Sequence, residues 1–151
     1  MLATWFGIGR LPIAPGTWGS LAALPFAWAI RDFWGVPGLG LASLIVFIAG
    51  CWAAGAFAKA SHVQDPSAIV IDEIAGQWLV LLAAPLSPLA WSLAFLLFRL
   101  FDIWKPWPVR WIDHHVKGGL GIMLDDVAAA GYAALALSAL LAIGGVLGVR
   151  R

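Results

Sequence analysis

The sequence predicts an all-α fold: a compact helical membrane protein that occupies residues 1–151 as a single domain. Residues of the apolar set AVILMFWYC make up 62% of the chain and charged residues only 11%, whereas a soluble domain is close to half apolar and a quarter charged. The mean hydropathy is +0.92. Four stretches of at least 20 residues contain no Asp, Glu, Lys or Arg, and about 20 apolar residues suffice to cross a bilayer as a helix.

The same composition excludes several other classes of protein. The apolar content excludes disorder, and the single cysteine, Cys51, excludes an internal disulfide scaffold. A net charge of +1 does not indicate a nucleic-acid-binding protein, which carries a marked excess of basic residues. A β-barrel needs alternating segments of about ten residues, which are not apparent here, and residues 1–9 lack the basic start and apolar run of a signal peptide.

Three of the four uncharged stretches each predict a spanning helix. The stretch 11–30 begins as a loop rich in Pro and Gly, so its helix is expected from about residue 17 to about residue 34. The stretches 33–58 and 127–149 have plainly apolar centres. Small residues in these two stretches, Gly50 and Gly131 among them, predict close packing between helices.

The fourth stretch, 74–98, is interrupted by Pro85-Leu86-Ser87-Pro88, which is turn chemistry. It forms either one kinked span, which gives four spans, or a hairpin of two short helices beside three spans. With four spans the basic residues divide four against five between the two sides, and with the hairpin they divide six against three. The second division is the asymmetry that membrane proteins show, so we favour the hairpin. The six residues, expected on the cytoplasmic side, are Arg10, Lys59, Arg99, Lys105, Arg110 and Lys117; the opposing three are Arg31, Arg150 and Arg151.

The acidic residues indicate a candidate site. Six of the eight acids fall into three short groups, which are Asp72 with Glu73, Asp102 with Asp113, and Asp125 with Asp126; Asp65 precedes the first group. An ionised side chain in mid-membrane costs at least about 2.5–3.5 kcal/mol, so several acids together need a compensating charge. Carboxylates without a cluster of His or Cys suit a hard cation such as Mg²⁺.

Each acidic group also has a purely structural explanation. Asp72 and Asp125 can cap the helices that follow them, and Arg99, Asp102 and Lys105 can form surface ion pairs at a spacing of three residues. The placement of all the groups on one predicted face favours a shared site. Neighbouring residues on a helix point about 100° apart, so neither adjacent acidic pair is expected to place both of its members on one ion.

Three further segments carry candidate chemistry. Residues 15–20, with two glycines before a helix, form either an anion-binding loop or a simple helix entry. The segment 105–108 is either an interfacial anchor or a phosphate contact. His115 could supply a general acid, whereas His114 is expected in a solvated loop.

Four motifs resemble those of the phosphatidylglycerophosphatase A family, in one order from about residue 7 to about residue 132. They are Leu11-Pro12-Ile13-Ala14-Pro15-Gly16-Thr17-Trp18-Gly19-Ser20, Asp65-Pro66-Ser67-Ala68-Ile69-Val70-Ile71-Asp72-Glu73-Ile74-Ala75-Gly76, Phe98-Arg99-Leu100-Phe101-Asp102-Ile103-Trp104-Lys105-Pro106-Trp107-Pro108, and Gly118-Gly119-Leu120-Gly121-Ile122-Met123-Leu124-Asp125-Asp126.

This resemblance implies a bacterial enzyme of the inner membrane. Its lipid substrate would be phosphatidylglycerophosphate, from which it removes the terminal phosphate to give phosphatidylglycerol and inorganic phosphate, with Mg²⁺ as cofactor. The resemblance also implies a compact all-helical fold with one helix surrounded by others. It leaves the oligomeric state and the preference among lipid phosphates open.

The resemblance also implies roles for individual residues. The family's acidic positions fall on Asp65, Asp72, Glu73, Asp102, Asp113, Asp125 and Asp126, and the metal ligands are expected among Asp72, Glu73, Asp125 and Asp126. The expected phosphate contacts are Thr17, Ser20, Arg99 and Lys105, and the expected catalytic residues are Asp72, Glu73, Asp102, Asp126 and His115. Either a protonated His115 or a metal-bound water would assist the leaving glycerol oxygen. His114 departs from a family position that is usually basic, and whether water or a carboxylate attacks phosphorus stays open.

Two other classes of function compete with a lipid phosphatase. A small ion-binding or transport subunit of the membrane would use the acids to carry ions, but the acids gather at predicted helix ends and not in mid-helix. A purely structural subunit leaves the acids unexplained. The signatures of other membrane phosphatases and of CDP-alcohol transferases, such as a D-x-D pair or a D-G-x-x-A-R motif, are absent from the sequence.

Overall fold

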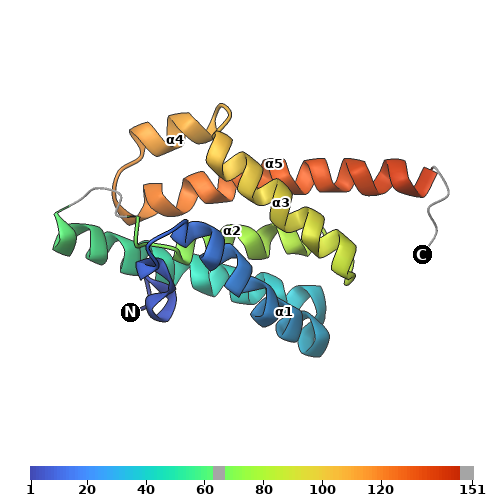
Figure 1. The fold of residues 1–151 in the computed structure, drawn as a ribbon, viewed down its shortest axis with the longest axis horizontal. Helices are drawn as coiled ribbons and strands as arrows, with labels where there is room; N and C mark the ends of the chain where they lie inside the picture. Colours follow the sequence, from blue (N-terminus) through green and yellow to red (C-terminus); the bar gives the residue numbers. More distant parts are fainter. Residues whose placement is uncertain (63–66, 147–151) are drawn as a thin grey trace.

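The described part of the chain in the computed structural model, residues 1–62 and 67–146, is helical and contains no strand. Its elements are the short 3₁₀ helix η1 (Trp5–Arg10), α1 (Pro15–Ser61), α2 (Ile71–Leu82), α3 (Pro88–Trp104), α4 (Val109–His115) and α5 (Gly118–Val146). The helices form a bundle elongated along one axis (Figure 1). The all-α prediction is confirmed, whereas Asp65, Arg150 and Arg151 lie outside the described residues.

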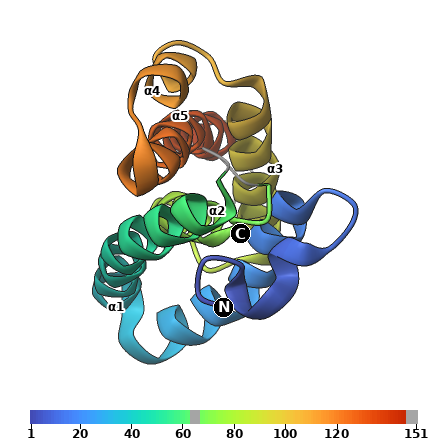
Figure 2. The same ribbon diagram turned by 90° about the vertical axis from the view of Figure 1, so that its left-hand side faces the viewer.

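The helix α1 folds back on itself at Gly35. This residue has φ 66° and ψ −163°, a conformation that glycine adopts without the steric cost of a Cβ. The break divides α1 into two arms, residues 15–34 and 36–61, which run in opposite directions (Figures 1 and 2). The sequence prediction of two successive helices over 17–34 and 33–58 is therefore confirmed.

The stretch 74–98 forms two helices and not one kinked span. The helix α2 ends at Leu82, and α3 begins at Pro88, after which the chain runs back along the bundle (Figure 1). Ser87 caps α3 by accepting a hydrogen bond from the Ala90 N–H at 3.2 Å, and proline suits the first helical position because it has no N–H to satisfy. Arg31 donates to the carbonyls of Leu81 and Ala84, at 2.6 and 2.7 Å, and so closes the other end of the turn.

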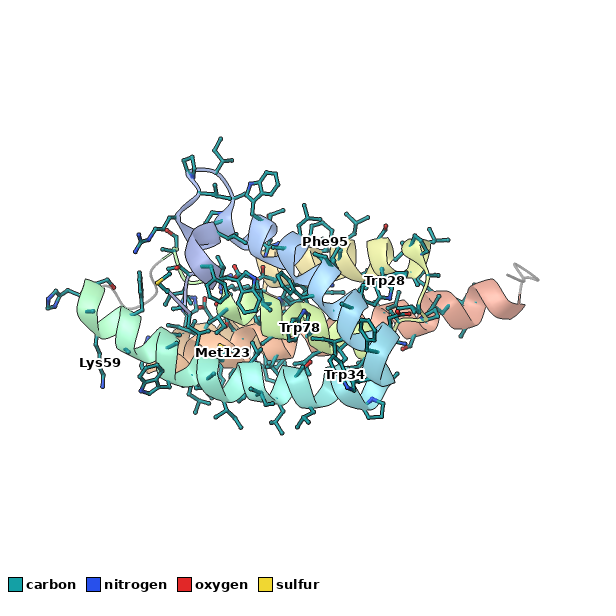
Figure 3. All side chains as sticks on the ribbon, turned by 90° about the horizontal axis from the view of Figure 1, so that it is seen from below. Trp28, Trp34, Lys59, Trp78, Phe95 and Met123 are labelled. Atoms are coloured by element: carbon teal, nitrogen blue, oxygen red, sulfur yellow. The ribbon has the colours of Figure 1, made fainter. Side chains whose placement is uncertain are left out.

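The helix α2 lies at the centre of the bundle. Eight of its twelve residues are buried, and α1, α3 and α5 all pack against it. Trp78, labelled in Figure 3, donates its indole N–H to the Ala23 carbonyl of α1 at 2.9 Å. This is the central helix surrounded by others that the resemblance implied, and its burial fixes where its first turn must lie.

Close helix contacts join α1 to α5. A Cβ at Gly119 would overlap the Cys51 carbonyl, so only glycine allows the backbones to approach there. A Cβ at Gly50 would lie 2.6 Å from the end of the Met123 side chain. The prediction for Gly131 is wrong: this residue lies on the exposed face of α5, and a Cβ there would meet nothing within 4 Å.

The two ends of the bundle differ in polarity. η1, α4, the starts of α1, α2 and α5 and the end of α3 lie together at one end, at the left of Figure 1, which we call the polar end. The Gly35 turn and the 83–87 turn lie at the other end. Two helices, α1 and α5, are long and apolar enough to cross a membrane by length and composition, and only 22% of the apolar window of each is buried. Such outward-facing apolar surface is that of a membrane protein.

Candidate active site

The predicted charged residues come together at the polar end. A pocket of about 240 Å³ lies between the start of α1, the start of α2, the end of α3 and α5. Five acids and two bases line it: Asp72, Glu73, Asp102, Asp125, Asp126, Arg99 and Lys105. Acidic side chains therefore outnumber basic ones by three in the described lining. An excess of this size in a small pocket calls for a bound cation.

Three carboxylates form the centre of the pocket. Asp72, Glu73 and Asp126 each offer a ligand oxygen, and these oxygens all lie within 4.8 Å of one another. Asp72 Oδ1, Glu73 Oε2 and Asp126 Oδ2 are buried and have no hydrogen-bond partner among the described residues. Unpartnered buried oxygens are costly, and a divalent cation that takes several carboxylate oxygens would satisfy all three. The acid triad, as we call Asp72, Glu73 and Asp126, therefore fits Mg²⁺.

The geometry of Asp72 and Glu73 differs from the expectation of two diverging side chains. Both belong to the first turn of α2, and both bring an oxygen into the acid triad. The 100° rotation between neighbours sets the direction of the Cβ atoms only. The additional methylene of glutamate then allows its carboxylate to reach the same point.

Burial disfavours charge on these two side chains. Burial raises the pKa of Asp72 well above its usual value, and the adjacent Glu73 carboxylate raises it further. Burial also raises the pKa of Glu73, although the nearby Arg99 partly opposes that shift. The protein thus holds acids whose charged form is unfavourable unless a cation is bound.

The adjacent acid Asp125 has a different environment from Asp126. Its Oδ2 accepts a hydrogen bond from Lys105 Nζ at 2.7 Å, and its Oδ1 accepts one from the Asp126 backbone N–H at 3.0 Å. Both oxygens are therefore engaged. Asp125 lies in the pocket as the partner of Lys105, whereas Asp126 belongs to the acid triad.

The two bases of the pocket are held by acids. Lys105, the residue that ends α3, also lies 3.1 Å from Asp113 of α4. Burial alone would lower the pKa of Lys105, but attraction by Asp125 and Asp113 raises it above its usual value, so the side chain stays protonated. Its Nζ lies at the edge of the pocket between α3, α4 and α5.

Arg99 links the acid triad to α3. Its Nη1 lies 2.5 Å from Asp102 Oδ2 and 3.9 Å from Glu73 Oε1. Its Nε is buried and has no hydrogen-bond partner among the described residues. The unpartnered N–H of this guanidinium, next to a candidate cation site, can donate a hydrogen bond to an anionic oxygen of a ligand. Asp102, predicted as catalytic, holds this guanidinium in place.

A close contact that the sequence did not predict brings α1 against the acid triad. A Cβ at Gly16 would overlap Glu73 Oε1 and lie 3.2 Å from Arg99 Nη1. A side chain at this position would displace the end of the flexible Glu73 side chain. The positive end of the α1 dipole therefore faces the pocket. The Gly-rich loop was the sequence signal for this position, but the partner of Gly16 depends on the three-dimensional packing of α1 on α2.

The other predicted site residues lie around the pocket or outside it. Thr17 is half-buried in the first turn of α1, and the buried Ser20 donates its hydroxyl to the Gly16 carbonyl at 3.0 Å. His115 is exposed on α4, where its ring stacks on Trp111 with centroids 4.8 Å apart, and it does not line the pocket. His114 is exposed beside it. The roles assigned to these residues stay predictions.

Comparison with known proteins identifies the family of the chain. The sequence model of the family described as Phosphatidylglycerophosphatase A matches residues 1–141. The chain is 44% identical over 130 residues to the Phosphatidylglycerophosphatase A of Escherichia coli (strain K12), covering 85% of this chain and 75% of the relative. It is 40% identical over 141 residues to the Phosphatidylglycerophosphatase A of Haemophilus influenzae (strain ATCC 51907 / DSM 11121 / KW20 / Rd), covering 93% and 86%. No solved structure matches the chain.

The electrostatics of the acid triad predict that Asp72→Asn stabilises the metal-free protein. Because burial raises the pKa of Asp72, its charge destabilises the fold at neutral pH, and this cost disappears as the pH falls through the raised value. In EDTA at pH 7.5 we therefore expect the variant to melt at a higher temperature than the wild type. The difference should shrink on acidification.

Thermal unfolding in detergent measures this effect, with Asp32→Asn as the matched control at the other end of the first arm. Added Mg²⁺ should raise the Tm of the wild type and leave that of Asp72→Asn almost unchanged. A variant that is less stable than the wild type in EDTA would show that the carboxylate is not under repulsion.

Proposed function

The chain belongs to the phosphatidylglycerophosphatase A family, and we propose that it hydrolyses phosphatidylglycerophosphate to phosphatidylglycerol and inorganic phosphate as one membrane-embedded domain. The observation that carries the proposal is the acid triad with its three unpartnered oxygens, next to Arg99 and Lys105 in one pocket. A cation site next to two fixed bases is what a phosphate monoester requires. The transport alternative explains neither the two bases nor the family membership.

We infer that Asp72, Glu73 and Asp126 hold Mg²⁺ in the working enzyme. When bound, the ion would neutralise charge on the phosphoryl oxygens and increase the electrophilicity of phosphorus. The three carboxylates fix its position because they come from two helices packed in the core. Asp125 contributes indirectly, by holding the Lys105 ammonium at the edge of the pocket.

Arg99 and Lys105 are the residues we assign to the phosphate. The fixed guanidinium of Arg99 has its Nε free to donate, and the protonated Lys105 adds a second positive charge. The first turn of α1, brought in by Gly16, adds the positive end of a helix dipole. Ser20 has its hydroxyl committed to the Gly16 carbonyl, so its proposed part is to keep this turn rigid, and Thr17 in the same turn is the nearer candidate for direct contact.

The departing glycerol oxygen must take up a proton. His115 is the donor that the sequence predicts, and its exposed position on α4 restricts that role to a headgroup that projects out of the pocket. Its ring nitrogen Nδ1 lies 2.9 Å from the Trp111 carbonyl. In the imidazolium form, Nδ1–H would donate to this carbonyl, and Nε2–H would be the group that gives its proton to the departing oxygen.

The lipid nature of the substrate agrees with the placement of the pocket. We infer that the two arms of α1 and the helix α5 cross the bilayer, because arms of 20 and 26 residues measure about 30 and 39 Å and the hydrocarbon core is about 30 Å thick. The 12-residue α2 is too short to cross, so α2 and α3 form the embedded hairpin. The pocket then lies where phosphate headgroups lie.

Charge indicates which side the pocket faces. The six basic residues expected in the cytoplasm all belong to segments that begin or end at the polar end, whereas Arg31 lies at the other end. By the positive-inside rule, the polar end would face the cytoplasm from a bacterial inner membrane.

Phosphate release tests the proposal directly. The purified protein in mild detergent should release phosphate from phosphatidylglycerophosphate with Mg²⁺ and not with EDTA. Asp72→Asn and Asp126→Asn should each lose at least about 100-fold in rate, because a ligand of the ion supplies about 3 kcal/mol or more of transition-state stabilisation. Asp32→Asn, an exposed acid outside the pocket, is the matched control and should keep full activity. Equal rates in Mg²⁺ and EDTA would refute the metal site.

Gly16 provides a second test that leaves the fold intact. In Gly16→Ala the new methyl group would displace the end of the flexible Glu73 side chain, so folding should change little while the acid triad is distorted. We expect activity to fall about tenfold or more, a loss of about 1.4 kcal/mol, and the Mg²⁺ concentration for half activity to rise. Gly131→Ala is the matched control, because its methyl group meets only open space. Unchanged activity in Gly16→Ala would show that Glu73 is not a ligand.

A further inference from the structure

A second, larger cavity at the polar end is separate from the acid triad. This groove of about 710 Å³ lies between the last turns of α1 and the start of α5, and Trp52, Gly55, Lys59, His62, Gly118 and Gly119 line it. It shares no described lining residue with the catalytic pocket. No carboxylate is among its described lining residues, in contrast to the acid-rich pocket.

An apolar stripe leads into one side of the groove. Leu41, Leu44, Ile45, Ile48 and Trp52 are each more than half exposed, and their spacing of three and four residues places them on one face of the second arm. Trp52 lies eleven residues after Leu41, a rise of about 16 Å along the helix axis. One leaflet of a bilayer has a hydrocarbon thickness of about 15 Å, half of the whole core. The stripe therefore matches an acyl chain in length.

The other side of the groove is basic. Lys59 lies seven residues beyond Trp52, about 10 Å further along the helix axis, and His62 ends the helix. Figure 3 shows Lys59 far from Trp34, which marks the turn between the two arms, and its side chain is directed away from the bundle. Gly118 and Gly119 are the first residues of the 29-residue α5, so the positive end of this helix dipole also faces the groove. The exposed Lys117 immediately precedes them.

We propose that this groove binds one anionic phospholipid from the same leaflet as the catalytic pocket. The phosphodiester contacts Lys59 and His62 at the entrance to α5, and an acyl chain follows the stripe to Leu41. Charge complementarity favours an anionic headgroup, and the leaflet-long apolar stripe favours a membrane lipid over a soluble anion. Lys59 also lies in the last turn of α1, where a cation stabilises the helix dipole, and the experiment separates that structural part from lipid binding.

The test measures lipid binding in detergent with EDTA, so that no turnover occurs. Short-chain phosphatidylglycerol is the probe, short-chain phosphatidylcholine is the neutral comparison, and the readouts are bound lipid by native mass spectrometry and the lipid-induced shift in Tm. We expect phosphatidylglycerol to bind more tightly. Lys59→Gln should weaken it roughly fivefold, which is the contribution of one lysine near an anionic headgroup. Arg10→Gln, an exposed base at the same end but outside the groove, should change nothing.

A filling variant tests the apolar part independently of charge. Ala56 is an exposed residue of the groove, so Ala56→Phe should fold normally and reduce the binding of both lipids. Both variants should keep wild-type phosphate release in detergent, which distinguishes this site from the proposed catalytic one. Equal binding of the two lipids, unchanged phosphatidylglycerol binding in Lys59→Gln, or loss of binding in Arg99→Gln instead would overturn the proposal.

Discussion

Repulsion among Asp72, Glu73 and Asp126 is the interaction on which the rest of the structure depends. Three carboxylate oxygens within 4.8 Å of one another destabilise a fold unless a cation joins them, so apolar packing must hold them together. The central helix α2, with eight buried residues of twelve, carries two of these acids. Two of the three acids are thus held rigidly, because they belong to a helix that is buried in the core. In the metal-free state, the same carboxylates that could bind an ion lower the stability of the fold.

The position of the pocket at the polar end suits a lipid substrate. Every charged residue of the pocket lies at the polar end of the bundle, next to the long apolar helices α1 and α5. A phosphate monoester on a lipid cannot leave the headgroup region. The pocket must therefore lie at that depth, next to apolar helix surfaces that the acyl chains can contact. The groove near Lys59 lies at the same end, so the proposed lipid site and the catalytic pocket would face the same leaflet.

The helices and the candidate acidic residues could be predicted from the sequence. Which acids enter the acid triad and which pair with a base could not. Proline and serine at 85–88 indicated the break between α2 and α3, and the excess of uncharged residues indicated the long helices. Which member of each adjacent pair enters the acid triad depends on tertiary contacts. Lys105 forms an ion pair with Asp125, and the absence of a Cβ at Gly16 leaves room for the Glu73 carboxylate. Both effects join segments far apart in the chain, where local spacing carries no information.

The position of a bound ion tests the central claim most directly. Mn²⁺ favours the same oxygen ligands as Mg²⁺ and gives an anomalous diffraction signal, so crystals of the Mn²⁺-loaded protein would locate the ion. The account predicts one strong peak in direct contact with carboxylate oxygens of Asp72, Glu73 and Asp126. A peak only between Asp113 and Asp125, or no peak in the pocket of a protein that releases phosphate with Mn²⁺, would contradict it.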